Sequence, residues 1–200
     1  MATTLLLTNT PSGVTGLPET EYDAWTSRGD AAVSETGIGD TDGVIDLIND
    51  VNGTIFWFSK PLAAVTIAGS ITFNMRMAES AMTTNNGAAV RVIRANGAGA
   101  EISTLLTSSH GVEMTTAETA RNWAATPTST AFADGDRLLI KCGATEVGAG
   151  AANIITLWFD GPSSGASGDS FLTFTETLTE FVAAADRVPR FSPYPQLLAH

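Results

Sequence analysis

Residues Val65 to Met77 read Val-Thr-Ile-Ala-Gly-Ser-Ile-Thr-Phe-Asn-Met-Arg-Met, and this stretch decides the fold class. Apolar side chains occupy the odd positions, apart from Gly69, and polar side chains occupy most even ones, which is the period of a half-buried β-strand. A helix would scatter the same apolar groups around its axis. At about 3.3 Å per residue the stretch would span roughly 40 Å, too long for one flat strand. We therefore predict a long central strand that bends at Gly69.

Further strands are expected before and after this stretch, with Gly-rich turns between them. Ala88 to Ala95 is interpreted as the return strand of a hairpin. Only one short helix is predicted, from Gly43 to Val51, on the spacing of its apolar residues. The other predicted strands are 54–60, 101–107, 137–143, 153–160 and 171–178. These elements predict an all-β fold: a two-sheet antiparallel sandwich, jelly-roll-like, with extended arms at both ends.

The domain boundaries follow from composition. A chain of 200 residues suits one sizeable domain, with or without arms. Residues 1–43 are rich in Thr, Gly, Pro and acidic side chains, which predicts an N-terminal arm. Residues 44–182 are expected to form the sandwich. Residues 183–200 are rich in proline, which favours extended chain and predicts a C-terminal arm.

Aromatic residues in these arms are candidates for assembly contacts. Tyr22 and Trp25 lie in the N-terminal arm, and Phe191 and Tyr194 lie in the C-terminal one. An exposed tryptophan on an arm can bury its ring on a neighbouring subunit, which would make a homo-oligomer. The alternative is that Trp25 packs on its own domain.

The net charge of the chain limits the classes of partner that we expect. The chain carries 10 Lys and Arg against 21 Asp and Glu, a formal charge of −11, and has no basic run. Nucleic-acid phosphates and anionic membrane surfaces would be repelled, so neither is an expected partner. No segment reaches the ~18 apolar residues of a membrane span, and the N-terminus lacks the pattern of a signal peptide, so we expect a soluble protein made in a cytoplasm.

Few residues could carry catalysis or hold a metal. Cys142 alternates with apolar neighbours and is interpreted as a buried small hydrophobe, so no disulfide is expected. The chain has two histidines, His110 and the C-terminal His200, and no nucleophile-elbow motif accompanies Ser108 or Ser109. We therefore interpret His110 as a loop histidine. No catalytic residue and no cofactor are predicted.

Two sets of carboxylates leave alternative functions open. Asp40, Asp42 and Asp46 are the best candidates for a calcium site, but their spacing fails the EF-hand loop and a solvated acidic face is the simpler interpretation. A pair of glycosidase carboxylates could form in three dimensions, although no pair stands out. The acids considered for it are Glu79, Glu101, Asp160 and Glu176.

Four blocks of sequence carry a resemblance. They are Phe56-Trp-Phe-Ser-Lys-Pro-Leu-Ala64, Ile67-Ala-Gly-Ser-Ile-Thr-Phe73, Ala78-Glu-Ser80 and Ala133-Asp-Gly-Asp-Arg-Leu-Leu-Ile140. In order and spacing they are similar to a β-sandwich module of tailed-bacteriophage virion proteins, over roughly residues 54 to 178. The resemblance implies a virion location, made in a bacterial host, with other capsid, collar or tail proteins as partners.

These arguments lead to one functional expectation and one alternative. The expectation is a non-enzymatic virion structural protein on the outer surface of the particle, for capsid decoration or at the collar or tail. The alternative is a carbohydrate-binding module by which the particle adheres to a host-surface glycan. Trp158 is its candidate contact, because it points away from Ile155, Leu157 and Phe159, although core of the other sheet is the preferred interpretation of Trp158.

Overall fold

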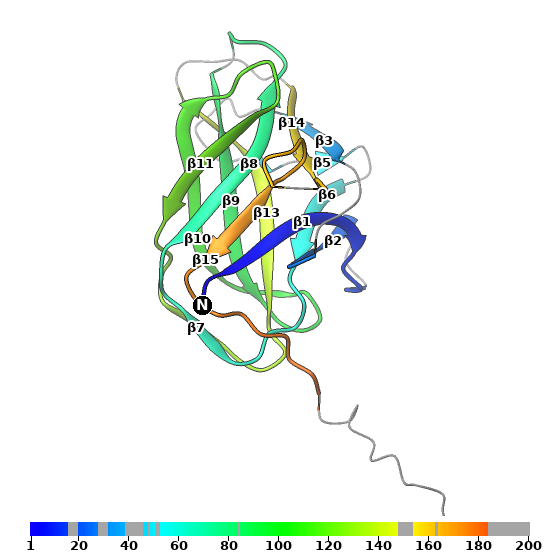
Figure 1. Cartoon of the computed structure of the whole chain (residues 1–200), viewed down its shortest axis with the longest axis vertical. Helices are drawn as coiled ribbons and strands as arrows, with labels where there is room; N and C mark the ends of the chain where they lie inside the picture. The colour runs from blue at the N-terminus through cyan, green and yellow to red at the C-terminus, as the bar shows by residue number, and fades with distance from the viewer. Residues whose placement is uncertain are drawn as a thin grey trace, which may run out of the picture.

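Every regular element that the computed structural model describes is a β-strand (Figure 1). The structure describes residues 1–15, 20–27, 32–38, 46–47, 49–50, 53–83, 85–147, 154–162 and 164–183. The strands are β1 Thr3–Pro11, β2 Thr20–Trp25, β3 Val33–Ile38, β4 Asp46–Leu47, β5 Asn49–Asp50, β6 Gly53–Phe58, β7 Val65–Ile67, β8 Ile71–Glu79, β9 Asn86–Ala95, β10 Glu101–Glu113, β11 Thr119–Ala125, β12 Thr130–Phe132, β13 Arg137–Glu146, β14 Ile154–Phe159 and β15 Phe171–Phe174.

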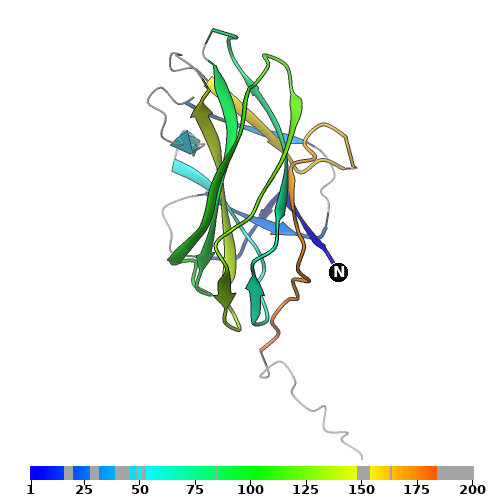
Figure 2. The same ribbon diagram turned by 90° about the vertical axis from the view of Figure 1, so that its left-hand side faces the viewer.

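The strands form two facing layers (Figure 2). Hydrogen bonds run along the order β10-β9-β13-β6-β2-β1-β15-β8-β14-β3, with β11 on the other edge of β8, so one continuous path folds over on itself. One layer contains β9, β10 and β13, and the other contains β8, β11, β14 and β15 (Figures 1 and 2). The all-β sandwich is confirmed. It is mixed rather than purely antiparallel, because β2 pairs with β6 in parallel.

The core lies between the layers and follows the predicted alternation. In β8 the side chains of Ile71, Phe73, Met75 and Met77 are fully buried, while the polar residues between them face outward. Phe73 stacks on Trp123 of β11 with ring centroids 4.8 Å apart. β8 is paired on both edges, and its apolar face therefore lies at the centre of its layer.

The stretch 65–77 is two strands rather than one bent strand. β7 pairs with β12 in a separate two-stranded sheet, and β8 joins the large sheet. Between them Glu176 Oε1 accepts hydrogen bonds from the amides of Ala68 at 2.9 Å and Gly69 at 2.6 Å. Burial would raise the pKa of Glu176, but these amide hydrogen bonds outweigh it and hold the pKa below its usual value. The charged Glu176 carboxylate therefore binds the two backbone amides that lie between β7 and β8.

The predicted N-terminal arm is wrong where the structure describes it. β1 pairs with both β2 and β15, so these residues form part of the sheet. Leu5 and Leu7 are buried in the main core. The short apolar run around them supplies a β-strand, and the Gly and Pro residues that suggested an arm only end it. Residues 183–200 were predicted as the second arm, and from 184 onward they lie outside the described residues, as do Phe191 and Tyr194.

Two other local predictions are also wrong. The helix expected from Gly43 to Val51 is replaced, in the residues described there, by β4 and β5, which pair with β13 and β6. β9 is not the hairpin partner of β8, because its two edges pair with β10 and β13 in the opposite layer. The chain thus crosses between layers after β8.

Among the described residues, no helix is long and apolar enough to span a membrane.

Candidate functional site

The described residues between β14 and β15 form a hydrogen-bonded loop on the outer face of one layer. Residues 155–158 of β14 pair with the second half of β8, and β15 pairs with its first half, so both strands lie along the same edge. The chain leaves this edge after Phe159 and returns at Phe171. Asp160, with φ 62°, and Gly168, with φ 74°, turn the chain at the two ends of the loop. A side chain at Gly168 would strike the backbone oxygen of Phe159.

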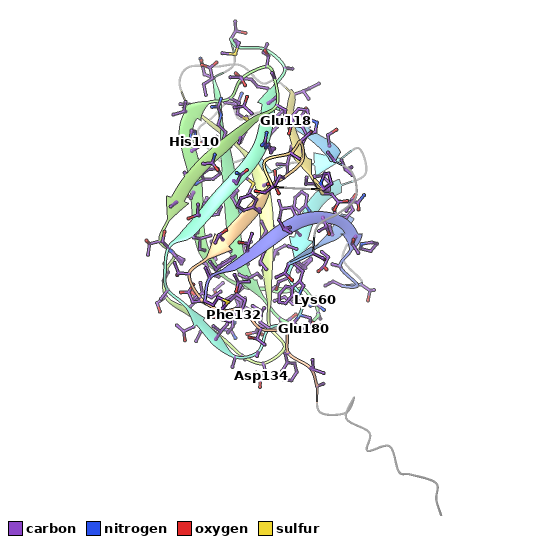
Figure 3. The ribbon with its side chains drawn as sticks, in the orientation of Figure 1. Lys60, His110, Glu118, Phe132, Asp134 and Glu180 are labelled. Atoms are coloured by element: carbon purple, nitrogen blue, oxygen red, sulfur yellow. The ribbon has the colours of Figure 1, made fainter. Side chains whose placement is uncertain are left out.

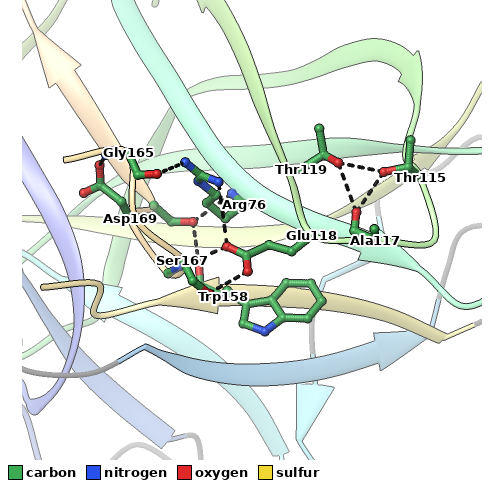
Figure 4. Close-up of polar contacts among 11 residues, drawn as sticks. Arg76, Thr115, Ala117, Glu118, Thr119, Trp158, Gly165, Ser167 and Asp169 are labelled. Atoms are coloured by element: carbon green, nitrogen blue, oxygen red, sulfur yellow. Dashed lines mark hydrogen bonds and ion pairs between the residues drawn. The ribbon is translucent and has the colours of Figure 1, made fainter. Parts of the chain in front are cut away.

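Arg76 and Glu118 clamp this loop from two other elements (Figure 4). Arg76 Nη2 donates to the carbonyl of Gly165 at 2.6 Å, and its Nη1 lies 4.0 Å from Glu118 Oε1. The Glu118 carboxylate accepts from Ser167 Oγ at 2.6 Å and from the amide of Gly168 at 3.1 Å. The Arg76 and Glu118 side chains are 18% and 20% exposed, so these contacts are partly shielded from water.

The turn before β11 holds Glu118 in place. The hydroxyls of Thr115 and Thr119 both donate to the carbonyl of Ala117, at 2.8 and 3.1 Å (Figure 4). On the other side, Asp169 Oδ2 accepts from the amide of Gly165 at 2.7 Å and closes the loop on itself. Clamp and loop therefore form one connected polar network.

Trp158 lies beside this network, on the outer face as its alternation in β14 predicts. Ile155, Leu157 and Phe159 are fully buried, whereas Trp158 is half-buried. It stands opposite Arg76 in the β8 pairing, and its indole lies next to Glu118 (Figure 4). The carbonyl of Trp158 accepts from Ser170 Oγ at 2.6 Å. An aromatic face, a guanidinium and a carboxylate thus meet on a rigid sheet, a combination that can bind and orient a polar molecule.

A second charged cluster lies at the other end of the molecule, where Figure 3 shows Lys60 beside Glu180. Lys60 Nζ is 3.6 Å from Glu180 Oε2, and Arg137 Nη1 donates to the carbonyl of Ser59 at 2.8 Å. Burial raises the pKa of Asp23, and the nearby charges of Lys60 and Arg137 only partly oppose this. This cluster is far from the loop, and it offers a carboxyl that holds its proton more tightly than usual.

The predicted assembly residues that the structure describes pack on their own domain. The Tyr22 ring lies 5.6 Å from Phe159 and 6.1 Å from Trp57, measured between centroids. Trp25 is packed against the core, with Lys60 Nζ 6.0 Å from its ring. Trp25 therefore packs on its own domain, which was the alternative considered from the sequence. An assembly role for Tyr22, Trp25, Phe191 and Tyr194 and a glycan contact at Trp158 stay predictions.

The residues considered for catalysis have separate surroundings. His110 lies in β10 rather than in a loop, edge-on to Trp123 at 5.9 Å. Ser108 Oγ accepts a hydrogen bond from the indole of Trp123 at 3.0 Å. Cys142 is buried as predicted, and burial raises the pKa of its thiol.

The carboxylates named from the sequence also serve different contacts. Glu79 Oε2 accepts from the amide of Asn86 at 3.1 Å, and Glu101 Oε1 accepts from Lys141 Nζ at 2.5 Å. Glu176 accepts hydrogen bonds from the amides of Ala68 and Gly69, just before β8. The calcium candidates at 40, 42 and 46 lie where no side chain is described. In the part of the chain that is described, no group of three or more His, Cys, Asp and Glu side chains could hold a metal ion.

The sequence pointed to Trp158 but missed its partners. Arg76 was visible as a charged residue on the polar face of the central strand. Glu118 gave no signal, because it lies in a turn within a region of weak periodicity. Only the pairing of β8 with β11 brings Glu118 to the loop.

Comparison with known proteins gave matches by structure alone. No protein-family model matches the sequence, and no curated protein does. A CocE/NonD family hydrolase from Staphylococcus aureus superposes with a TM-score of 0.59 at 9% identity, over 87% of this chain and 36% of that one. An α-amino acid ester hydrolase superposes with a TM-score of 0.55 at 11% identity, over 86% and 35%. An aminopeptidase from a marine sediment thaumarchaeon gives 0.54 at 9%, over 88% and 37%.

These matches contradict the expected function. The similar structures are hydrolases and a peptidase, so a non-enzymatic virion structural protein, whether capsid decoration or tail component, is not supported, and the virion adhesion alternative falls with it. At this level of identity the likeness shows the fold alone, and the chain spans little more than a third of each hydrolase. The resemblance to phage proteins, the virion location and the expected partners stay untested predictions.

Proposed function

We propose that this chain is the β-sandwich part of a hydrolytic enzyme and that it binds and orients the substrate there. The supporting observation is the coverage of the structural matches. Nearly all of this chain, 86–88%, aligns with only 35–37% of each hydrolase. The whole fold thus recurs as one portion of larger enzymes.

The chemistry of the described residues supports a binding role. Hydrolysis of an ester or amide through a serine or cysteine nucleophile ordinarily places that nucleophile within hydrogen-bonding reach of a base. Among the described residues His110 is the one histidine, and the neighbouring Ser108 hydroxyl takes the Trp123 indole hydrogen instead. The Cys142 thiol is buried with a raised pKa, so its thiolate is not available. The bond-breaking residues are therefore proposed to lie outside the described part of the chain.

The clamped loop is the proposed substrate-binding surface. Trp158 offers one face of its indole, and Arg76 and Glu118 offer fixed charges beside it. Because all three stand on paired strands or on a hydrogen-bonded turn, they lose little conformational freedom when a molecule binds. A preorganised surface of this kind would position a polar substrate for catalytic residues in another part of the enzyme.

Paired activity assays test this proposal. The isolated chain and the native protein, purified from cells that produce it, would each be incubated with p-nitrophenyl esters and aminoacyl p-nitroanilides. We expect turnover by the native protein only. Trp158→Ala in the native protein should raise KM about tenfold with kcat little changed, as loss of uniform binding does.

The matched control is Ile154→Ala, on the same strand and exposed, which should leave KM unchanged. The proposal is wrong if the native protein hydrolyses neither substrate class. It is equally wrong if the isolated chain hydrolyses either one and loses that activity in His110→Ala.

A further inference from the structure

Asparagine is followed directly by glycine at residues 52–53, 86–87 and 96–97, and the structure describes the last two of these pairs. Asn96 and Gly97 lie in the turn that joins β9 to β10, and both are exposed. Asn86 and Gly87 begin β9, and both are buried, with Asn86 at 0% exposure. The two pairs thus carry the same chemical groups in opposite surroundings.

An asparagine side chain can react with the backbone amide of the residue that follows it. The amide nitrogen attacks Cγ, the side-chain nitrogen leaves as ammonia, and a five-membered succinimide ring remains. Water then opens the ring at either of its two carbonyl carbons, which gives aspartate or isoaspartate. The attack requires an amide that can approach Cγ and can lose its proton to water or hydroxide. Glycine after the asparagine favours the reaction, because it has no side chain to block the approach.

The turn after β9 presents Asn96 in a form that suits this attack. Asn96 Oδ1 accepts hydrogen bonds from the amides of Ala98 and Ala100, both at 3.0 Å. Negative charge develops on this oxygen when Cγ is attacked, and two N–H groups that already point at it stabilise that charge. Among the described residues the Gly97 amide has no acceptor, so it gives up no hydrogen bond when it reacts.

The fold opposes the same reaction at Asn86. The Asn86 amide donates to Glu79 Oε2 at 3.1 Å, and its carbonyl accepts from the amide of Met114 at 2.6 Å. Gly87 is paired with β10 on one side and with β13 on the other. Movement of the Gly87 amide toward Cγ would break this pairing, and bulk water does not reach the buried side chain. Asn86 therefore serves as an internal reference for Asn96.

We propose that Asn96 is a site of self-modification, at which the folded chain converts its own asparagine into aspartate and isoaspartate. The co-reactant is water, and no enzyme takes part. The product adds a negative charge to the turn, and the isoaspartyl form also lengthens the backbone between β9 and β10. Arg137 Nε donates to the carbonyl of Gly97 at 3.3 Å, so a cation lies at the turn that gains this charge. The proposal goes beyond the proposed function and does not depend on it.

Timed incubation of the folded chain tests the proposal. Samples would be digested at acid pH, which stops the reaction, and the peptides that carry Asn86 and Asn96 would be resolved into asparagine, aspartate and isoaspartate forms by chromatography and mass spectrometry. We expect Asn96 to convert at least about tenfold faster than Asn86, because only its neighbouring amide is free to reach Cγ. The rate should rise as the buffer is made more alkaline, since the Gly97 amide must lose its proton.

Two controls show whether the fold sets this difference. In urea, where the sheet no longer holds Gly87, the two sites should convert at rates within about threefold of each other. Gly97→Ala places a methyl group beside the attacking nitrogen, so conversion of Asn96 in the folded protein should slow about tenfold. Asn96→Gln has a side chain one carbon longer, which cannot close the five-membered ring, and its peptide should stay unchanged over the same period.

The proposal is overturned if Asn96 stays asparagine in the folded protein over a period in which both sites convert in urea. It is also overturned if folded Asn86 converts as fast as Asn96, or if Gly97→Ala leaves the rate at Asn96 unchanged. Circular dichroism of each sample shows whether the chain is folded. If Gly97→Ala does not fold, the comparison of the two sites in the unaltered chain, folded and in urea, decides alone.

Discussion

Replacing Phe73 by alanine should remove one of the largest contributions to the core. The side chain is fully buried in the middle of β8, and deleting a buried phenylalanine costs about 3–5 kcal/mol. Its ring also stacks on Trp123 with an interplanar angle of 21°, an arrangement worth about 0.5–1.5 kcal/mol beyond buried area. We therefore expect Phe73→Ala to lower the free energy of unfolding by about 4 kcal/mol.

Urea unfolding followed by tryptophan fluorescence and circular dichroism would measure this loss. Thr72→Ala is the matched control, because Thr72 is the preceding residue on the same strand but is exposed, and its replacement should cost less than about 0.5 kcal/mol. If Phe73→Ala does not fold, Phe73→Leu should still cost about 1 kcal/mol. A Phe73→Ala protein within about 1 kcal/mol of Thr72→Ala would refute the packed interior.

Four further predictions concern single residues. Gly69→Ala would place its Cβ 1.9 Å from Thr175 Oγ1, so it should destabilise the protein by about 1–3 kcal/mol in urea unfolding. Glu118→Gln should weaken the clamp and raise the hydrogen-exchange rate of the Gly168 amide about tenfold. Asp23→Asn should raise the urea midpoint at pH 7, because burial raises the pKa of Asp23 and the folded state therefore disfavours its charged form. Cys142 should resist thiol reagents in the native protein, since burial raises its pKa, and react fully in urea.

Controls separate these effects from general destabilisation. Thr175→Ala should relieve part of the cost of Gly69→Ala, because it removes the atom that the new Cβ would strike. Glu180→Gln, in an ion pair with Lys60, should leave the exchange of Gly168 unchanged.

The sign of the Asp23 effect sets its pH dependence. A carboxyl whose pKa is raised by folding contributes stability below its unfolded value of 3.8 and loses that contribution as the pH rises through the folded pKa. The gain from Asp23→Asn should therefore disappear on acidification below that value. A gain that persists there would contradict the burial argument.

The strand pattern of the sequence predicted β8 because its alternation is strict. Each apolar residue from Ile71 to Met77 proved buried. The division at Gly69 could not be predicted, since it depends on a carboxylate 107 residues away in the chain. Periodicity reports which face of a strand is buried, but it does not report which sheet the strand joins.

The N-terminal strand escaped prediction for a related reason. Its apolar run is short and is followed by Gly and Pro residues that signal a turn, and composition over a long window hid it. Leu5 and Leu7 become buried only because β1 pairs with β2 and with β15, which comes from the far end of the sequence. Long-range pairing of this kind leaves no local mark.

The sequence predicted only part of the candidate site. The alternation of β14 correctly predicted that Trp158 points away from Ile155, Leu157 and Phe159, but the preferred interpretation, core of the other sheet, was wrong because Trp158 is half-buried. The contact between Arg76 of β8 and Glu118 was not distinguished by any pattern. Charged residues in turns acquire a role only when the fold brings them to a partner.

Active-site labelling tests the central claim most directly. The native protein would be treated with a phosphonate probe that reacts with activated serines, and the labelled residue would be located by peptide mapping. We predict that the label falls outside the described residues, in the portion of the enzyme that supplies the nucleophile. A label on a serine of the sandwich, such as Ser108 or Ser109, or complete absence of hydrolytic activity and label, would contradict the account.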